Sequence, residues 1–417
     1  MSRRLILVAL DWLRPKDPRA SLGHASLHAR LVDVPELEVV PIACAVNVVE
    51  FDHRSLLADI VRAAVPGSDI AIGVYVWNEH VVQWLLPSLR QAGFTGRIIL
   101  GGPQITYAPA DILDVYPDAD VIIRGYAEDA LAAVVERPDA VAMRGVIWRG
   151  SPDTTHPAAA DLLSLPSPIL TGIAPIQPFM RWETQRGCIY TCSFCQHRET
   201  GVRLRQRVLA DERVSAEVDA LVHGGAREIA VLDPIFHTNP AALDILGRFA
   251  DRGYRGRLSL QSRFESIDDA FLDACSEVQV RLEFGLQTIQ HAEMVAVRRM
   301  NGLVATDAAI KKLHARGIPF EVSLIYGLPE QTLTSFEQSV QWCRDRGVPV
   351  IRAFPLMLLR GTELDRDRRR WGLVESDDPI PVVVGSTTFS RPEWEQMRGI
   401  ADRLDGEIST VGALGAA

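Results

Sequence analysis

Short apolar runs alternate with amphipathic stretches over the first 136 residues. The apolar runs are residues 4–10, 37–45, 69–76, 96–102 and 119–125. Between them, apolar side chains recur at helical spacing in residues 21–32, 54–65 and 79–93. Strands that are apolar throughout and alternate with helices indicate a parallel sheet covered on both faces. The pattern predicts a doubly wound, Rossmann-like α/β domain over residues 1–136, with ligands at the carboxyl ends of its five strands.

Residues 137–179 break this alternation. A short hairpin-like stretch at 145–150 is followed by six prolines between Pro152 and Pro178, so we expect a linker on the surface. The alternation resumes in a region that we bound at 180–356. Its candidate strands are residues 179–184, 227–233, 257–262, 280–285, 320–327 and 350–358. Six strand–helix units predict a partial (β/α)6 TIM-like barrel with its functional residues at the strand carboxyl ends. Residues 357–417 form a small C-terminal tail of mixed polar segments.

Composition and charge narrow the class of protein. With 47% hydrophobic and 23% charged residues, the chain has the composition of a globular protein. The net charge of −9 argues against a broad nucleic-acid surface, which requires clustered basic residues. The apolar run that begins the chain is too short for a signal peptide, and no run approaches the roughly 20 residues of a membrane span. We expect a cytoplasmic monomer that binds neither nucleic acid nor membrane.

Three of the six cysteines lie within eight residues, in the loop that follows the first strand of the second region. Cys188, Cys192 and Cys195 have the spacing Cys-x3-Cys-x2-Cys, and their soft sulfur atoms suit zinc, copper(I) or an iron–sulfur cluster. A structural zinc ion would need a fourth ligand, and His197 is close in sequence. Three thiolates on a four-iron cluster would instead leave one iron open for a substrate. From the residues alone, both interpretations stay open.

The segment RGCIYTCSFC, residues 186–195, resembles the radical S-adenosylmethionine superfamily. In that family the three cysteines bind a [4Fe-4S] cluster, and the amino acid part of S-adenosylmethionine chelates the fourth iron. An aromatic residue typically precedes the last cysteine, and Phe194 occupies that position. The resemblance also implies an external electron donor of the flavodoxin or ferredoxin type.

Three later segments extend this resemblance. SLIYGLPE (323–330) is similar to the segment that packs against the adenine, although Ser323 replaces its first glycine. LEFGLQT (282–288) is similar to the strand near the ribose, and AVLDPIFHTNP (230–240) to a strand end that lacks the family's usual Gly-Gly-Glu. The resemblance assigns contacts with S-adenosylmethionine to Phe194, Asp233, Glu283, Gln287, Ser323, Gly327 and Glu330.

The first domain resembles the cobalamin-binding domain that precedes the barrel in one branch of this superfamily. The resemblance rests on residues 73–78, 99–107 and 123–131, where Gly-Tyr-Ala-Glu stands for the branch's usual Gly-Glu-Gly-Glu. It assigns cobalamin contacts to Tyr75, Trp77, Asn78, Gly101, Gly102, Pro103, Gln104, Gly125 and Glu128. The chain has no Asp-x-His-x-x-Gly signature, so no histidine of that motif can ligate cobalt. Trp77 is similar to the aromatic residue under the corrin in members without such a ligand.

The resemblance implies a cobalamin-dependent radical S-adenosylmethionine C-methyltransferase. It would generate a 5′-deoxyadenosyl radical and methylate an unactivated carbon of a small, specialised-metabolite substrate, with the tail closing the barrel. Candidates for orienting the substrate or cofactor are Glu183, Gln185 and Arg263. Alternatives are a cobalamin-containing enzyme that cyclises, rearranges or transfers another fragment of S-adenosylmethionine, a relative that has lost cobalamin, and a zinc-binding structural or sensor protein.

Overall fold

The computed structural model describes residues 3–14, 16–18, 20–137, 142–197 and 206–414. By its internal contacts the chain divides into two compact units. The first is built mainly from residues 1–181 and the second mainly from residues 182–417, while residues 207–225 group with the first unit. No helix among the described residues is long and apolar enough to cross a membrane.

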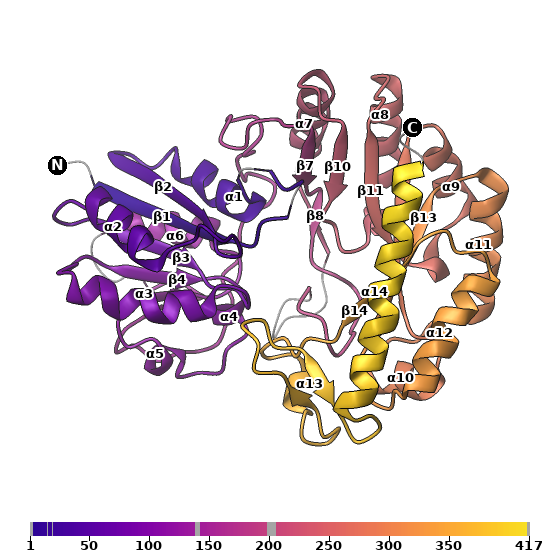
Figure 1. Cartoon of the computed structure of the whole chain (residues 1–417). Coiled ribbons are helices and arrows are strands. Elements are labelled where there is room, and N and C mark those ends of the chain that lie inside the picture. The colour runs from indigo at the N-terminus through magenta and orange to yellow at the C-terminus, as the bar shows by residue number, and fades with distance from the viewer. Residues whose placement is uncertain (1–2, 15, 19, 138–141, 198–205, 415–417) are drawn as a thin grey trace. The chain divides into compact units, whose positions relative to one another are not determined.

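The first unit contains a six-stranded sheet with the order β2-β1-β3-β4-β5-β6 (Figure 1). Its strands are β1 (Arg3–Asp11), β2 (Leu37–Ala45), β3 (Asp69–Gly73), β4 (Ile98–Gly101), β5 (Val121–Ile123) and β6 (Val146–Trp148). The first five strands pair in parallel and β6 pairs antiparallel with β5. The strand order reverses between β1 and β3, which is the point where ligands bind in open α/β sheets.

Helices cover both faces of this sheet. They are α1 (Leu22–Leu31), α2 (His53–Ala63), α3 (Glu79–Gln91), α4 (Pro103–Thr106), α5 (Ile112–Val115) and α6 (Glu128–Glu136). Alternate residues of β1 enter two separate cores. Ile6 and Val8 pack with residues of α2 and α3, whereas Leu5 and Leu7 pack with residues of α1 and α6. The prediction of a doubly wound domain is therefore confirmed.

Two features of this unit differ from the expectation. β2 is an edge strand and its residues are only half-buried or exposed, although its sequence is nearly as apolar as that of β1. The proline-rich segment is packed rather than free: Ala158, Leu162, Leu165 and Ile169 are each at most 6% exposed, and Ala158 bridges to Gly125. Its apolar side chains fall between prolines and have no helical or strand period, so the sequence pattern did not show their burial.

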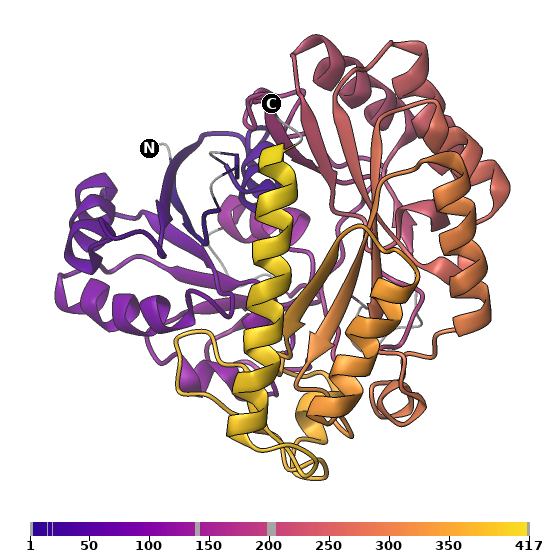
Figure 2. The ribbon, with the colours of Figure 1, turned by 45° about the vertical axis from the view of Figure 1, so that its right-hand side comes forward.

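The second sheet has the order β14-β13-β12-β11-β10-β7 (Figure 2). Its strands are β7 (Phe179–Trp182), β10 (Glu228–Val231), β11 (Arg257–Ser262), β12 (Val280–Gln287), β13 (Phe320–Tyr326) and β14 (Ile351–Pro355). The strands from β10 to β14 pair in parallel. On β12, buried residues alternate strictly with half-buried ones, as expected for a strand with helices on one face and a more open interior on the other.

Helices connect these strands and give the predicted partial barrel. They are α7 (Asp211–His223), α8 (Ala242–Asp251), α9 (Asp269–Ser276), α10 (His291–Ala296), α11 (Leu303–Arg316) and α12 (Leu333–Asp345), with short 3-10 turns at Phe236–Thr238 and Phe264–Ser266. The remaining short elements are β8 (Gln185–Arg186), β9 (Arg207–Val208), α13 (Glu363–Arg366) and the antiparallel pair β15 (Val374–Glu375) and β16 (Val383–Gly385).

The C-terminal region is more than a polar tail. It ends in α14 (Arg391–Leu414), which packs against β14, β13 and α12 (Figures 1 and 2). Trp394, Met397 and Leu404 on this helix are at most 5% exposed. We therefore assign α14 as the barrel helix that follows the last strand, reached from β14 through a long connection.

Candidate functional site

The three clustered cysteines lie on a loop that follows β8, near the carboxyl end of the first barrel strand. Cys192 is buried, Cys188 and Cys195 are half-buried, and all three are free thiols. Burial raises the pKa of Cys188, and it raises the pKa of Cys195 to about 11. Metal ions bind cysteine as the thiolate, so metal binding would release protons from the thiols.

The spacing of the sulfur atoms bears on the zinc alternative. Thiolates around one tetrahedral zinc ion stand about 3.8 Å apart, since each Zn–S bond is about 2.3 Å. Within the described ranges, no three His, Cys, Asp or Glu side chains converge closely enough to hold one metal ion. A four-iron cluster takes one cysteine per iron, so its ligands stand farther apart. Cys188, Cys192 and Cys195 would supply one thiolate to each of three irons of such a cluster.

Side chains and backbone of the second unit hold this loop in place. The Arg263 guanidinium lies 4.0 Å from the ring centroid of Tyr190 and donates to the Met300 carbonyl at 3.1 Å. The backbone of Ser193 donates to Val297 O and accepts from Leu364 N, both at 2.9 Å. Arg263, a candidate for orienting substrate, is thus a buried support of the cysteine loop.

Arg299 is a residue that the sequence analysis missed. Its guanidinium approaches the sulfur of Cys192 at 3.5 Å through Nη1, donates to Gly285 O through Nη2, and is 9% exposed. Its buried Nε has no hydrogen-bond partner among the residues that the structure describes. Arg299 is one of two adjacent arginines after a short helix, and such a pair carries no signal of its own in a single sequence.

Gln287 lies at the carboxyl end of β12, where the pairing with β13 shifts register. It has a positive φ of 69°, which is rare for a residue with a side chain. Its Oε1 is buried and, within the described part of the chain, accepts no hydrogen bond. Its amide nitrogen covers Gly285, where an added Cβ would come within 2.6 Å of it. A strained residue with an unsatisfied buried acceptor at a strand end suits a polar ligand.

Glu283 lies deeper in the barrel, four residues or roughly 13 Å before Gln287 along the strand. The neighbouring Glu321 forms ion pairs with Arg281 at 3.5 Å and with Arg352 at 3.2 Å. Burial first, and then repulsion by Glu321, raise the pKa of Glu283. Its position places it in a charged interior layer rather than beside Gln287.

Asp233 follows β10 and has no exposed surface. Its carboxylate accepts hydrogen bonds from Thr184 N at 2.7 Å, from Gln185 N at 3.1 Å and from the Thr184 hydroxyl. Burial raises its pKa to about 7. With its oxygen atoms engaged in this way, Asp233 fixes the backbone that enters the cysteine loop.

The other two orienting candidates also have partners in the second unit. Gln185 donates to Ile235 O at 2.8 Å and accepts from Gln206, whereas Glu183 forms an ion pair with Arg186 at 2.7 Å. Both residues support the strand end from which the loop starts.

The residues that were predicted to contact the adenine lie on β13 and in the turn that follows it. Gly327 has a φ of 92°, and Glu330 is exposed with a φ of 64°. The fully buried Gln331, which the sequence analysis missed, accepts from Gly327 N at 2.7 Å and from Leu328 N at 3.2 Å. Ser323 lies opposite Gly285 across the strand pair, and Phe194 is half-buried on the cysteine loop.

In the first unit, the predicted cobalamin residues lie at the carboxyl ends of β3, β4 and β5. Trp77 stacks on Tyr75 with 4.4 Å between ring centroids, and its indole N–H donates to Leu10 O at 3.0 Å. Asn78 is fully buried, donates to the same carbonyl at 2.9 Å and accepts from Tyr75 N at 2.8 Å. These bonds join the loop after β3 to the end of β1 and fix the position of both aromatic rings.

The loops after β4 and β5 carry the remaining predicted residues. Gly102 has a φ of 90°, and an added Cβ would lie 2.6 Å from Val74 O, so glycine is required there. Gly125 has a φ of 85° and a similar clash with Ala158 O at 2.4 Å. Gly101 is less constrained, because its nearest contact would be 3.5 Å away.

The polar members of this set have protein partners. Gln104 donates to Glu79 at 2.5 Å, and Glu128 accepts from Ser26 at 3.0 Å. Pro103 begins α4. The glycines at 102 and 125 allow close packing against the backbone of Val74 and Ala158, which fixes the loops that carry this predicted set.

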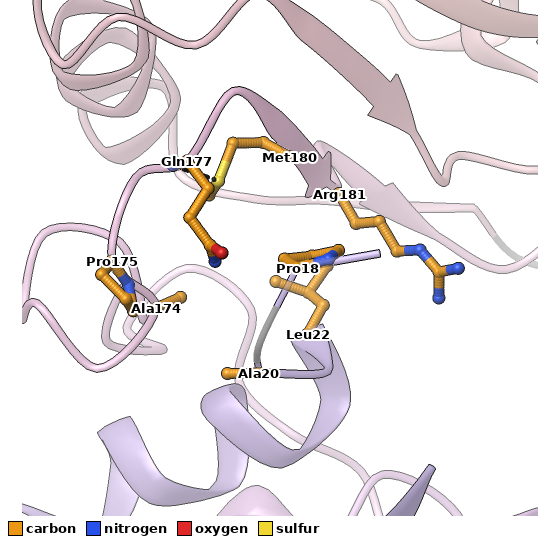
Figure 3. A pocket seen from close by; sticks show the side chains of 8 residues that line it. All are labelled: Pro18, Ala20, Leu22, Ala174, Pro175, Gln177, Met180 and Arg181. Atoms are coloured by element: carbon orange, nitrogen blue, oxygen red, sulfur yellow. Dashed lines mark hydrogen bonds between the residues drawn. The ribbon is translucent and has the colours of Figure 1, made fainter. Parts of the chain in front are cut away.

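A small pocket elsewhere in the first unit does not serve as the site (Figure 3). Its wall includes Pro18, Leu22, Pro175 and Met180, and its volume of about 10 Å³ suits about one water molecule. It is too small for an organic substrate.

Comparison with known proteins agrees with this geometry. Residues 182–343 match the model of the radical SAM superfamily. Over 301 residues the chain is 25% identical to the cobalamin-dependent radical SAM methyltransferase TokK of Streptomyces tokunonensis, covering 65% of this chain and 44% of TokK. Over 325 residues it is 24% identical to the 2-(S-pantetheinyl)-carbapenam-3-carboxylate methyltransferase of Streptantibioticus cattleyicolor, covering 70% and 47% of the two chains. The chain thus spans about half the length of these relatives.

Two solved structures have the same fold. The radical S-adenosylmethionine methyltransferase TsrM of Kitasatospora setae superposes with a TM-score of 0.74 at 16% identity, covering 97% of this chain and 89% of TsrM. The cobalamin-dependent S-adenosylmethionine radical enzyme OxsB superposes with a TM-score of 0.70 at 14% identity, covering 97% of this chain and 67% of OxsB.

The cysteine motif lies inside the matched segment, so this chain contains a radical S-adenosylmethionine domain over residues 182–343. More particularly, in sequence and in two-unit fold it is a relative of the cobalamin-dependent radical S-adenosylmethionine methyltransferases. The predicted family and fold class are confirmed.

Proposed function

We propose that this chain is a cobalamin-dependent radical S-adenosylmethionine methyltransferase that methylates an unactivated carbon of a small, specialised-metabolite substrate. One observation carries the proposal. The chain presents a three-cysteine loop at a barrel rim, and in the first unit it presents a stacked aromatic pair and glycine turns at the carboxyl ends of β3, β4 and β5. The first feature suits a cluster with an open iron, and the second suits a large planar ligand.

The residues present fit these groups. Cys188, Cys192 and Cys195 would hold the cluster, and the unsatisfied Oε1 of Gln287 marks a polar contact at the adjoining strand ends. Cobalamin would lie against the Tyr75–Trp77 stack and Gly102. When bound, the cluster supplies the electron that cleaves S-adenosylmethionine, and cobalamin supplies the methyl group. An external electron donor of the flavodoxin or ferredoxin type would reduce the cluster.

The relatives support a small-molecule substrate. TsrM has been solved with a tryptophan substrate, and one sequence relative is named for a carbapenam carboxylate. We propose that this chain is a monomeric, cytoplasmic enzyme and that its substrate is of comparable size.

The test is metal analysis of protein purified without oxygen after expression with hydroxocobalamin. We expect about four irons per chain with an iron–sulfur absorption shoulder, together with near-equimolar cobalt and corrin bands. Substitution of the three cysteines by alanine should remove the iron and leave the cobalt. Iron without cobalt would refute cobalamin-dependent methylation, whereas zinc in place of iron would refute the radical chemistry altogether. With both cofactors present, candidate substrates are screened for the mass gain of one methyl group.

A further inference from the structure

A fully buried arginine closes the loop that follows β4. Arg124 comes directly after β5 and has no exposed surface. Its guanidinium donates to the carbonyl oxygen atoms of Ile105 and Ala108, both at 2.7 Å, and of Pro109 at 2.8 Å. Its charge is balanced by Asp153, whose side chain is 8% exposed and which lies in the proline-rich segment.

The loop depends on this arginine for its shape. Ile105 and Thr106 end the single turn of α4, so their carbonyl groups have no partners further along a helix. Residues 107–111 form turns without regular secondary structure. A buried ion pair is costly unless all its hydrogen-bonding groups have partners. Here the N–H groups of the guanidinium that do not face Asp153 donate to the carbonyl groups of one loop.

The same arginine links three segments of the first unit. Gly125, the next residue, donates its N–H to the Thr106 hydroxyl at 3.0 Å. The Arg124 carbonyl accepts from Ala158 N at 2.7 Å. The loops after β4 and β5, which carry Gly102 and Gly125, are therefore fixed against each other and against residues 153–158.

We propose that Arg124 and Asp153 are positioning residues for cobalamin, and that the proline-rich segment is part of the framework of the cobalamin site. The inference rests on the proposed function, since it concerns a cofactor that the function requires. Neither side chain needs to touch the cofactor. The pair holds the loop that begins at Gly102 in its binding conformation, so the backbone entropy of that loop is lost on folding rather than on binding.

Arg90 offers a matched control. It donates to the carbonyl groups of Phe94 at 3.0 Å and Gly96 at 2.8 Å, and it forms an ion pair with Asp120 at 2.6 Å. These residues lie in the loops that precede β4 and β5, at the opposite edge of the same sheet. Arg90 thus has the same type of bonding as Arg124 but no connection with the predicted cobalamin loops.

The experiment uses the full chain with Arg124→Lys, Asp153→Asn or Arg90→Lys. The dissociation constant of hydroxocobalamin is measured by absorbance titration well below each variant's melting temperature, and iron content is measured alongside. We expect Arg124→Lys and Asp153→Asn to weaken cobalamin binding by roughly tenfold or more, equivalent to about 1.4 kcal/mol, with unchanged iron content. Arg90→Lys should lower the melting temperature with less than about a twofold change in the dissociation constant.

Three results would overturn the inference. In the first, Arg124→Lys and Asp153→Asn both bind hydroxocobalamin as tightly as the unaltered chain. In the second, Arg90→Lys weakens binding as much as these two variants do, and the loss then reflects general destabilisation. If the unaltered chain itself fails to bind, the proposed function fails together with the inference. Asp153→Asn decides the matter if Arg124→Lys does not fold.

Discussion

The replacement of Gly102 by alanine should be far more damaging than a single added methyl group usually is. Gly102 has a φ of 90° and a ψ of 176°, a region that residues with a side chain rarely enter. An added Cβ would lie 2.6 Å from Val74 O and 2.8 Å from Val74 N. Both atoms belong to backbone that cannot move aside as a flexible side chain could.

The cost follows from these contacts. Backbone strain at such a position is worth about 1–3 kcal/mol. Val74 N donates to Gly101 O at 2.8 Å and Val74 O accepts from Gln104 N at 3.1 Å, and displacement of Val74 would weaken both bonds. At about 1 kcal/mol for each bond, Gly102→Ala should lower the free energy of unfolding of the first unit by roughly 3–5 kcal/mol.

Gly93 and Gly101 provide the controls. Gly93 has a φ of 87° with nothing within 4 Å of an added Cβ, so Gly93→Ala should cost only about 1–2 kcal/mol of strain. Gly101 has an ordinary φ and a nearest contact of 3.5 Å, so Gly101→Ala should cost less still. Urea unfolding followed by far-ultraviolet circular dichroism measures all three. Equal midpoints for Gly102→Ala and Gly93→Ala would refute the reasoning, because the two differ mainly in the contacts of the added carbon.

Three further predictions concern single side chains. Arg299→Met should make the cluster harder to reduce, because it removes an N–H group aimed at the Cys192 sulfur. Redox titration monitored by electron paramagnetic resonance measures the reduction potential, and an unchanged potential at equal iron content would contradict this prediction. Trp77→His should change the cobalt absorption spectrum by placing an imidazole beside the corrin, and an unchanged spectrum would mean that position 77 is remote from the metal. Because the pKa of Asp233 rises from about 4 in the unfolded chain to about 7 in the folded one, its contribution makes the folded chain less stable as pH rises through that range. Asp233→Asn should flatten this dependence in unfolding curves recorded from pH 4 to 8, and a slope identical to that of the unaltered chain would contradict the assignment.

Local patterns in the sequence were sufficient for the elements of the fold and the class of chemistry. Buried parallel strands are apolar along their whole length and bounded by polar turns, so the five parallel strands of the first sheet and the six strands of the second could be placed without a structure. The spacing of Cys188, Cys192 and Cys195 limits the metal chemistry because all three thiols come from one short loop. Gly102 could also be singled out from the sequence alone, because it belongs to a glycine pair that ends an apolar strand.

Only the tertiary structure decided which residues support those sites. Arg299, Gln331 and Arg124 are polar residues whose importance comes from partners between 3 and 107 positions away, and a single sequence does not show such pairings. The structure also placed Glu283 in a charged layer inside the barrel and showed that the carboxylate of Asp233 is engaged by backbone N–H groups. Periodicity reports which face of an element is apolar. The partner that satisfies a buried polar atom is set by how distant segments pack, and that information exists only in the folded chain.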